Sequence, residues 1–416
     1  MRSPGPAPAA AAGGGTVAHR GGHLGAVDVV RFLTILGVIV VHATSLVSQA
    51  GPDAPAGGTV AGGAVLVLLH VTRNVFLMLS AFVLAYSMQS RPLATRAFWR
   101  RRYPLVVAPY VAWSAIYVAV DGGLVGPVHA AERFDWDLLT AGAHFHLYFL
   151  LLTFQLYVVF PWLYRLLSRR PRLHAPVLVA SLLFQLAFTT AVQYGPRPPV
   201  IGVWLDHPGS WLPSYQLYVI GGLVAALHLD AVTAWVRAHG RLVAVSVVAS
   251  GLLGLGAYAA GLTALGLTPV ASSAVFQPVT VVETVAATVS QYALGCWAMD
   301  RLGARRTGQL RAASDASFGV YLAHPLVLSG VLGLAGWAGL SGLLGSWPGA
   351  VIEALVVVGL MPFTYAVTVA GVALSRGTPL SLVLSGRRRR GPGPAPRPAP
   401  TPASFPLTPV ASPSDA

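Results

Sequence analysis

Long apolar runs recur along almost the whole chain, and each is about as long as a helix that crosses a lipid bilayer. A span needs roughly 20 apolar residues, because each helical residue advances the chain by only about 1.5 Å. Ten such runs predict an all-α integral membrane protein, a bundle of about ten transmembrane helices. The predicted spans are residues 24–47, 64–88, 103–120, 146–167, 175–193, 213–229, 241–262, 279–299, 317–340 and 350–374.

The composition agrees with a membrane protein. Hydrophobic residues make up 55% of the 416 residues and charged residues only 10%, whereas soluble domains are about a quarter charged. The mean hydropathy is +0.66. The net charge of +14 lies in short clusters between the apolar runs, so it is interpreted as a signal of membrane topology, and no nucleic-acid partner is expected.

The basic residues are distributed unequally between the two sides of the predicted bundle. All 27 are arginines. The termini and alternate loops on one side hold 23 of them, the other side holds only Arg133 and Arg197, and Arg31 and Arg73 lie inside spans. Because cytoplasmic loops carry the excess of arginine, both termini are expected in the cytoplasm and the chain in the cytoplasmic membrane.

The two ends of the chain differ in composition from the part between them. Residues 1–22 are mostly Ala, Gly and Pro, and the other end is rich in Arg and Pro. Neither can bury a core, so the predicted organisation is a disordered tail over 1–22, a ten-helix membrane domain over 23–376 and a disordered tail over 377–416. The arginines at 387–390 are interpreted as a stop-transfer signal, with contact to anionic lipid headgroups as the alternative.

Three ionisable residues lie in the first predicted span, where each costs free energy. An arginine or aspartate at the centre of a span costs roughly 2.5–3.5 kcal/mol. Arg31 and His42 are 11 residues apart, so they project from one helical face about 16 Å apart. Asp28 precedes Arg31 by three residues, and the two can pair. This alignment suggests a polar path through the bundle, although His42 alone fits equally well a buried imidazole that bonds a neighbouring helix.

The same residues suggest two kinds of chemistry. A histidine can act as general base toward a hydroxyl that attacks a carbonyl, or it can carry an acyl group itself. Arg31, near the cytoplasmic side, can hold an anionic molecule. A cytoplasmic acyl donor that meets His42 inside the membrane is one interpretation, and a proton-coupled transporter is the other.

Five short segments carry sequence patterns that occur together in one known family. They are VDVVRFLTILGVIVVHA at 27–43, RNVFLMLSAFVLAYS at 73–87, FWRRRYPLVVAPYVAW at 98–113, HLYFLLLTFQLYVVFPWL at 146–163 and SDASFGVYLAHPLVL at 314–328. In this order they resemble the integral-membrane acyltransferase-3 family, which includes bacterial O-antigen and other polysaccharide O-acetyltransferases. Ala81 stands where glycine is usual and Tyr148 where tryptophan is usual.

The resemblance implies an acyltransferase that transfers groups other than aminoacyl groups. The donor is usually acetyl-CoA, which is a co-substrate, and the protein is expected to hold no bound cofactor. The acceptor is a hydroxyl of a carbohydrate-containing molecule such as a surface polysaccharide, glycolipid or glycosylated metabolite. His42 and Arg31 match the essential residues of the family. The expected partners are the lipid bilayer, acyl-CoA and this acceptor; a glycan or small-molecule exporter and a structural scaffold are the alternatives.

A basic cluster precedes the third span, at the segment that resembles the family's basic motif. It consists of Arg100, Arg101 and Arg102. The planar guanidinium group can bond two phosphate oxygens at once, and coenzyme A carries a pyrophosphate and a ribose phosphate. We expect this cluster to bind the acyl donor, with a topology signal as the alternative.

Further ionisable residues are candidates for lining a cavity. Arg73 is near the middle of the second span and shares a helical face with His70. Its expected counterion is Glu283 or Glu353, and its alternative role is to stabilise a developing oxyanion.

Two histidines complete the candidates. His324 precedes a proline, which frees a backbone carbonyl, so it is expected to be structural or cavity-lining. His146 is expected at a helix start, facing outward. No group of His, Asp and Glu has the spacing of a metal site, and the single Cys296 excludes an internal disulfide.

Overall fold

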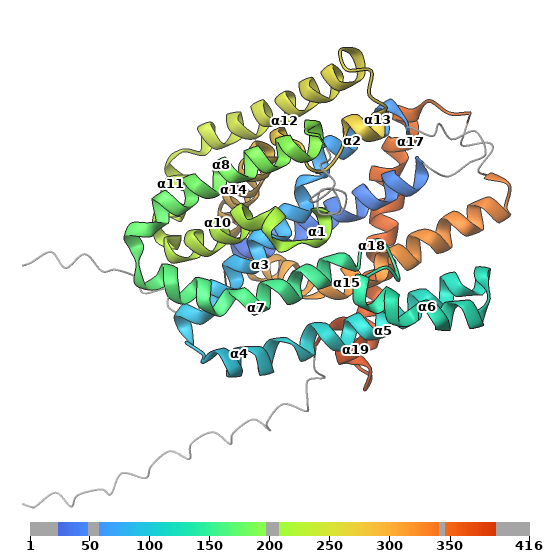
Figure 1. Ribbon diagram of the computed structural model, residues 1–416, viewed down its shortest axis with the longest axis horizontal. Helices are drawn as coiled ribbons and strands as arrows, with labels where there is room; N and C mark the ends of the chain where they lie inside the picture. Colours follow the sequence, from blue (N-terminus) through green and yellow to red (C-terminus); the bar gives the residue numbers. More distant parts are fainter. Residues whose placement is uncertain (1–23, 49–57, 197–207, 341–345, 388–416) are drawn as a thin grey trace, which may run out of the picture.

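The computed structural model describes residues 24–48, 58–196, 208–340 and 346–387 (Figure 1). Within these ranges the chain forms helices and no β-strand, which confirms the predicted all-α class. The predicted tail over residues 1–22 and most of that over 377–416 lie outside the described residues. The helices are α1 Gly25–Val47, α2 Val60–Leu69, α3 Val71–Ser90, α4 Thr95–Arg102, α5 Pro104–Val125, α6 Pro127–Thr140, α7 Tyr148–Arg169, α8 His174–Tyr194, α10 Gln216–Leu227, α11 Leu229–Ala238, α12 Gly240–Thr263, α13 Pro269–Ser272, α14 Pro278–Arg301, α15 Ala304–Trp337, α17 Gly349–Leu355, α18 Met361–Arg376 and α19 Ser381–Ser385, with short 3₁₀ turns at Pro171–Leu173, Pro208–Ser210 and Leu212–Tyr215 and a π-helical turn at Val356–Leu360 between α17 and α18.

The helices lie where the spans were predicted, and a bundle of roughly ten membrane helices is compatible with them. In the described part of the chain, eight helices are long and apolar enough to cross a membrane. A ninth span is counted if Leu212–Leu227 and Leu229–Ala238, bent by 91°, are taken together. The eighth predicted span corresponds to α14, which has 24 residues but carries Glu283 and Asp300, and these acidic residues lower its hydropathy.

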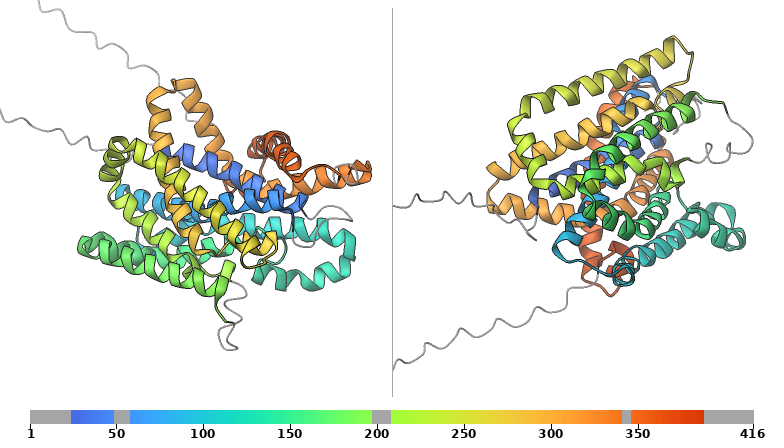
Figure 2. Two further views of the ribbon diagram at one scale, coloured as in Figure 1. Left: turned by 90° about the horizontal axis from the view of Figure 1, so that it is seen from above. Right: turned by 60° about the vertical axis from the view of Figure 1, so that its left-hand side comes forward.

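Helix α1, which bears Arg31 and His42, lies in the centre of the bundle. In its most apolar stretch 72% of the residues are buried, against 22% in α8 and in α12. Its neighbours are α2, α3, α14, α15 and α18 (Figures 1 and 2). The polar residues of α1 therefore face protein and not lipid, as the cost of an ionised group in lipid requires.

Helices α3 and α10 pack closely against each other. Gly222 of α10 lies against the backbone of Met78 in α3, closer than any side chain would allow. Small residues at such a crossing permit the van der Waals contact that holds membrane helices together. This packing fixes α3, the helix that carries Arg73.

The ordered chain continues past the predicted end of the membrane domain at residue 376. A turn after α18 leads into α19, Ser381–Ser385, which packs on α5, α15 and α18. The prediction of a disordered tail from residue 377 is wrong for residues 377–387. The cause is packing against three helices, which the local composition does not reveal.

Candidate active site

A cavity of about 260 Å³ lies among α1, α3, α7 and α15, and we call it the histidine cavity. His42 of α1 lines it together with His70, at the junction of α2 and α3, and Arg73 of α3. The shared helical face predicted for His70 and Arg73 thus opens into the same space as His42. His146 also lines this cavity and is only 1% exposed, so the expectation that it faces outward is wrong.

His42 makes no hydrogen bond to any residue that the structure describes. Its ring lies 4.8 Å from that of Phe145 and 5.2 Å from that of His324, centroid to centroid. These contacts orient the imidazole without occupying its nitrogens. Both nitrogens are therefore left to a molecule in the cavity, as a general base or an acyl carrier requires.

His324 packs behind His42 and owes its orientation to the following proline. Pro325 lies inside α15 and has no N–H, so the carbonyl of Tyr321 loses its helical donor. The Nδ1–H of His324 donates to this carbonyl oxygen at 2.8 Å. His324 is fully buried and does not line the cavity, so it positions His42 by contact.

Arg73 has hydrogen-bonding capacity that the described residues do not use. Its Nη1 donates to the Tyr148 hydroxyl at 3.2 Å, and its guanidinium carbon lies 5.0 Å and 4.9 Å from the ring centroids of Tyr215 and Phe276. Its Nε and Nη2 atoms are buried without a hydrogen-bond partner among the described residues. A buried, unpaired guanidinium edge is costly, unless a ligand supplies the acceptor.

The counterions expected for Arg73 lie elsewhere. Among the described residues, no ion pair joins Arg73 to Glu283 or Glu353. Glu353 accepts a hydrogen bond from the Thr44 hydroxyl at 2.7 Å. Glu283 is 3% exposed, and both carboxylate oxygens lack a partner in the described chain. Neither glutamate lines the histidine cavity.

His70 presents one defined nitrogen to the cavity. Its Nδ1 lies 2.7 Å from the backbone oxygen of Ser273. A carbonyl can only accept, so Nδ1 carries the proton and Nε2 is left as an acceptor. This second imidazole is therefore a further proton acceptor beside His42.

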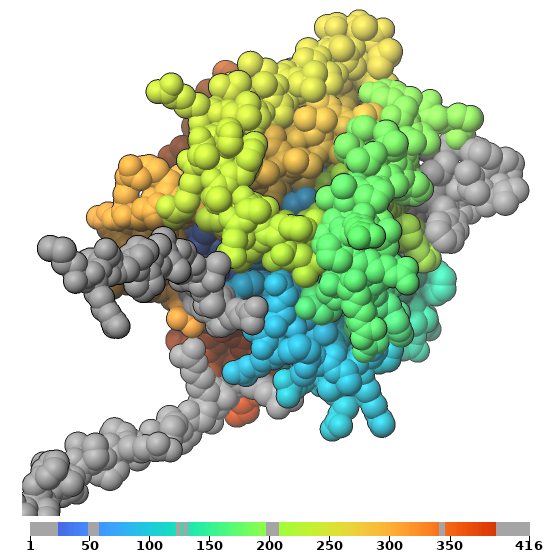
Figure 3. Space-filling model, turned by 90° about the vertical axis from the view of Figure 1, so that its left-hand side faces the viewer, coloured from blue at the N-terminus to red at the C-terminus, as the bar shows by residue number. Residues whose placement is uncertain are grey.

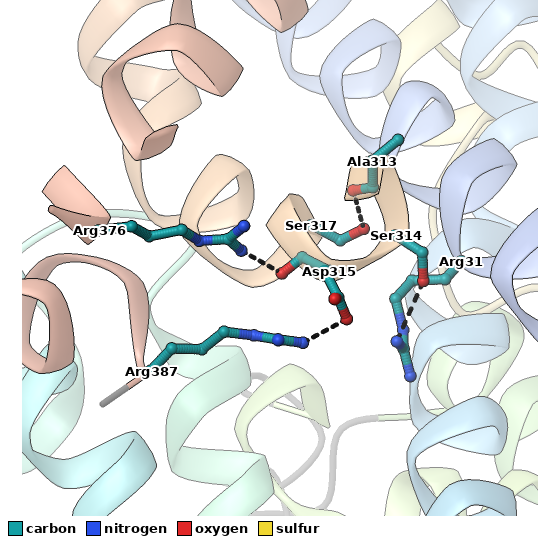
Figure 4. Close-up of polar contacts among 7 residues, drawn as sticks. All are labelled: Arg31, Ala313, Ser314, Asp315, Ser317, Arg376 and Arg387. Atoms are coloured by element: carbon teal, nitrogen blue, oxygen red, sulfur yellow. Dashed lines mark hydrogen bonds and ion pairs between the residues drawn. The ribbon is translucent and has the colours of Figure 1, made fainter. Parts of the chain in front are cut away.

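A second cavity, of about 280 Å³, carries Arg31 and Arg102, and we call it the arginine cavity. Arg31 donates through Nη1 to the Ser314 hydroxyl at 3.1 Å (Figure 4). Asp28 is 4% exposed and lies near enough to Arg31 to interact with its charge, but it does not line the cavity.

Only one of the three clustered arginines reaches this cavity. Arg102 lines it and donates to the Ser87 hydroxyl at 3.4 Å. Arg100 and Arg101 are exposed on α4 and are not part of the lining. In Figure 3 the cyan surface of α4 lies between the green surface of α7 and α8 and a small red patch of the C-terminal segment.

A proline in α7 explains how α4 is held in this position. Pro161 lacks an N–H, so the carbonyl of Tyr157 is free of its helical bond. Trp99 of α4 donates its Nε1–H to this oxygen at 2.8 Å. At the start of α4, Arg165 donates to the Thr95 hydroxyl at 2.6 Å. The first residue and the middle of α4 are thus attached to α7.

Three aromatic side chains line both cavities, and we call them the aromatic partition. They are Phe76, Phe149 and Tyr321. The ring of Phe149 lies 6.1 Å from that of Phe76 and 5.7 Å from that of Tyr321, centroid to centroid. The two cavities therefore meet at a wall of side chains and not at a wall of backbone.

The part of the chain that the structure describes contains no group of three His, Cys, Asp or Glu side chains that could hold a metal ion. The described chain forms a multi-pass helical bundle, and the arginine cavity lies next to the histidine cavity in its interior. Such a site suits the transfer of a group from an anionic carrier.

Comparison with protein families identifies the class. A family model described as an acyltransferase domain matches residues 24–373. The chain belongs to this acyltransferase-3 family and is a membrane acyltransferase. Comparisons with curated proteins and with solved structures found no significant match.

Proposed function

We propose that this protein transfers an acyl group, most simply acetyl, from cytoplasmic acyl-CoA to a hydroxyl of a sugar-containing acceptor. The observation that carries the proposal is the meeting of the arginine and histidine cavities at the aromatic partition. The protein would act in the cytoplasmic membrane with both termini in the cytoplasm, as the 23 arginines on one side suggest.

The two cavities suit the two ends of acyl-CoA. Arg31 and Arg102 would hold its phosphates, because guanidinium groups bond phosphate oxygens in pairs. The pantetheine arm would pass the aromatic partition and bring the thioester to His42. The rise along α1 from Arg31 to His42 is about 16 Å, which an extended pantetheine arm can bridge.

The proposed reaction is a single acyl transfer. His42 removes the proton from the acceptor hydroxyl as its oxygen attacks the thioester carbon. The unpaired Nε and Nη2 of Arg73 stabilise the oxyanion that develops. The carbon–sulfur bond then breaks, and the proton on His42 passes to the leaving sulfur. The products are the acyl ester and free coenzyme A.

An acceptor that cannot enter the histidine cavity would require a relay. His42 would then attack the thioester itself and hold the acyl group until the acceptor hydroxyl takes it. Both free nitrogens of His42 are compatible with this route. The alternative, an exporter of the same family, shares the path through the bundle, but the matching family model is described as an acyltransferase domain.

The test is thiol release from acetyl-CoA by the purified protein in detergent, with a panel of glycans and glycosides as acceptors. We expect thiol release that depends on the acceptor, and an acceptor that gains the mass of one acyl group. Longer acyl-CoAs and succinyl-CoA, run in parallel, identify the acyl group. A protein that neither binds coenzyme A nor acylates any member of the panel contradicts the proposal.

A further inference from the structure

The arginine cavity includes a wall that lies beyond the family match. That match ends at residue 373, whereas Ser385, Gly386 and Arg387 all line the cavity. They follow α19, which packs against α5, α15 and α18. The cavity is therefore completed by a segment that follows the matched residues.

The backbone of this segment is held in place from both sides. The indole Nε1–H of Trp113 donates to the carbonyl of Leu384 at 3.2 Å, and the hydroxyl of Ser381 donates to the carbonyl of Arg387 at 2.8 Å. Gly386, with φ +65°, ends α19 in the left-handed region that favours glycine.

The same glycine packs too closely for a side chain. A Cβ on Gly386 would run into the ring of Phe318 and lie 3.0 Å from the carbonyl oxygen of Leu105. Pro109 in α5 leaves that carbonyl without its helical donor. The following residue, Arg387, lines the cavity.

Arg387 is engaged there by a carboxylate next to the Arg31 site. Its Nη2 lies 2.5 Å from Oδ1 of Asp315, and the two side chains are 45% and 25% exposed. Asp315 follows Ser314, whose hydroxyl accepts from Arg31 (Figure 4). The cavity thus contains the guanidinium groups of Arg31, Arg102 and Arg387 against the single carboxylate of Asp315.

We propose that Arg387 binds a phosphate of the acyl-CoA donor, and that Asp315 holds its side chain in place until this phosphate displaces the carboxylate. The proposal rests on the proposed function, since it names a binding residue of the same donor site. Partly exposed ion pairs are weak. A phosphate monoester carries more negative charge than a carboxylate and offers three acceptor oxygens, so the exchange favours the donor.

The test measures the affinity of the full-length protein for coenzyme A by isothermal titration. Arg387→Ala should weaken binding by about tenfold or more, the loss expected for a charged hydrogen bond. Asp315→Asn should tighten it several-fold, because the competing charge is removed while the shape is kept. In the double variant, Asp315→Asn should no longer tighten the binding of coenzyme A, because there is no Arg387 side chain for Asp315 to engage.

The matched control is Arg237→Ala. Arg237 forms a two-pronged ion pair with Asp300, at 2.9 Å for each contact, and lines neither cavity. This variant removes the same charge and breaks the same kind of pair outside the site, so its affinity should equal that of the wild type.

The outcomes separate this inference from the proposed function. If the wild type binds coenzyme A and Arg387→Ala binds it equally well, the inference is overturned while the donor assignment stands. The same holds if Arg237→Ala weakens binding as much as Arg387→Ala does. Weaker binding by Asp315→Asn contradicts the exchange. A wild-type protein that does not bind coenzyme A removes both the proposed function and the inference.

Discussion

Arg73 is the residue whose environment departs most from that of a structural arginine. It lies among aromatic rings and a tyrosine hydroxyl, with no carboxylate partner in the described chain and two buried donor atoms unused. Burial of such a group is expensive. The position of Arg73 in the wall of the histidine cavity is explained if the substrate develops a negative charge that accepts hydrogen bonds from its two unused donor atoms.

We expect Arg73→Lys to lower kcat by about 10²–10³-fold, the usual effect of losing one oxyanion donor, with little change in KM for acyl-CoA. A lysine keeps the charge but lacks the planar pair of donors. Tyr148→Phe, which removes only the hydroxyl that accepts from Arg73, serves as the milder control. An unchanged kcat in Arg73→Lys, or a loss confined to KM, would exclude this role.

His144, in the turn before α7, predicts a dependence of stability on pH. Its Nδ1 lies 3.0 Å from Nδ1 of His146, so one of the two must be unprotonated to accept. Burial lowers the pKa of His144 to about 4, below the ordinary value near 6.5. Between these values the unfolded chain binds more protons, so stability falls as the pH is lowered.

The unfolding temperature of the wild type in detergent should therefore fall between pH 7 and pH 5. In His144→Gln the fall should be smaller, because the group that resists protonation has been removed. Scanning fluorimetry at both pH values measures the difference. An equal fall in the two proteins would assign the pH dependence to other groups.

At the level of elements, the close crossing of α3 and α10 predicts a helix contact that is sensitive to substitution. Gly222→Ala places a methyl group against the backbone of Met78, and overpacking of this kind costs about 1–3 kcal/mol. We expect a lower unfolding temperature. The control is Gly333→Ala on α15, where the added methyl meets no atom within 4 Å. Equal stability of the two variants would contradict the packing argument.

The helical elements were predictable from the sequence, and the site was predictable only in part. A run of apolar residues and the 3.6-residue period are local properties, so the positions of the membrane helices and the shared face of Arg31 and His42 follow from them. The meeting of His42 with His324, and of Arg31 with Ser314, joins residues far apart in the chain. Resemblance to a family indicated these segments, but no local pattern could pair them.

Two misjudged segments show the same limit. His146 was expected to face outward because it begins a helix, yet it is buried beside Tyr321, whose hydroxyl donates to its carbonyl. The segment after residue 376 looks like the start of a disordered tail, but its residues Ser381–Ser385 form α19, which packs on α5 and α15. Helix patterning gives no information on such contacts, because they depend on the packing of distant elements.

For the whole molecule, the distribution of arginine predicts which loops face the cytoplasm. Cys296 is the only cysteine, so Cys296→Ala gives a background for labelling. In intact cells, Glu132→Cys should react with a membrane-impermeant maleimide, whereas Arg169→Cys should react only after the cells are opened. Labelling of Arg169→Cys alone in intact cells would reverse the proposed orientation.

For the whole molecule, binding and chemistry are assigned to different cavities, and His42→Ala tests this assignment. Acetyl transfer and coenzyme A affinity are measured on the same preparations, with His239→Ala, an exposed histidine outside both cavities, as control. We expect His42→Ala to lose about 10²–10⁴-fold in rate, with its affinity for coenzyme A unchanged. Transfer that continues at the wild-type rate would show that the reaction does not take place at His42.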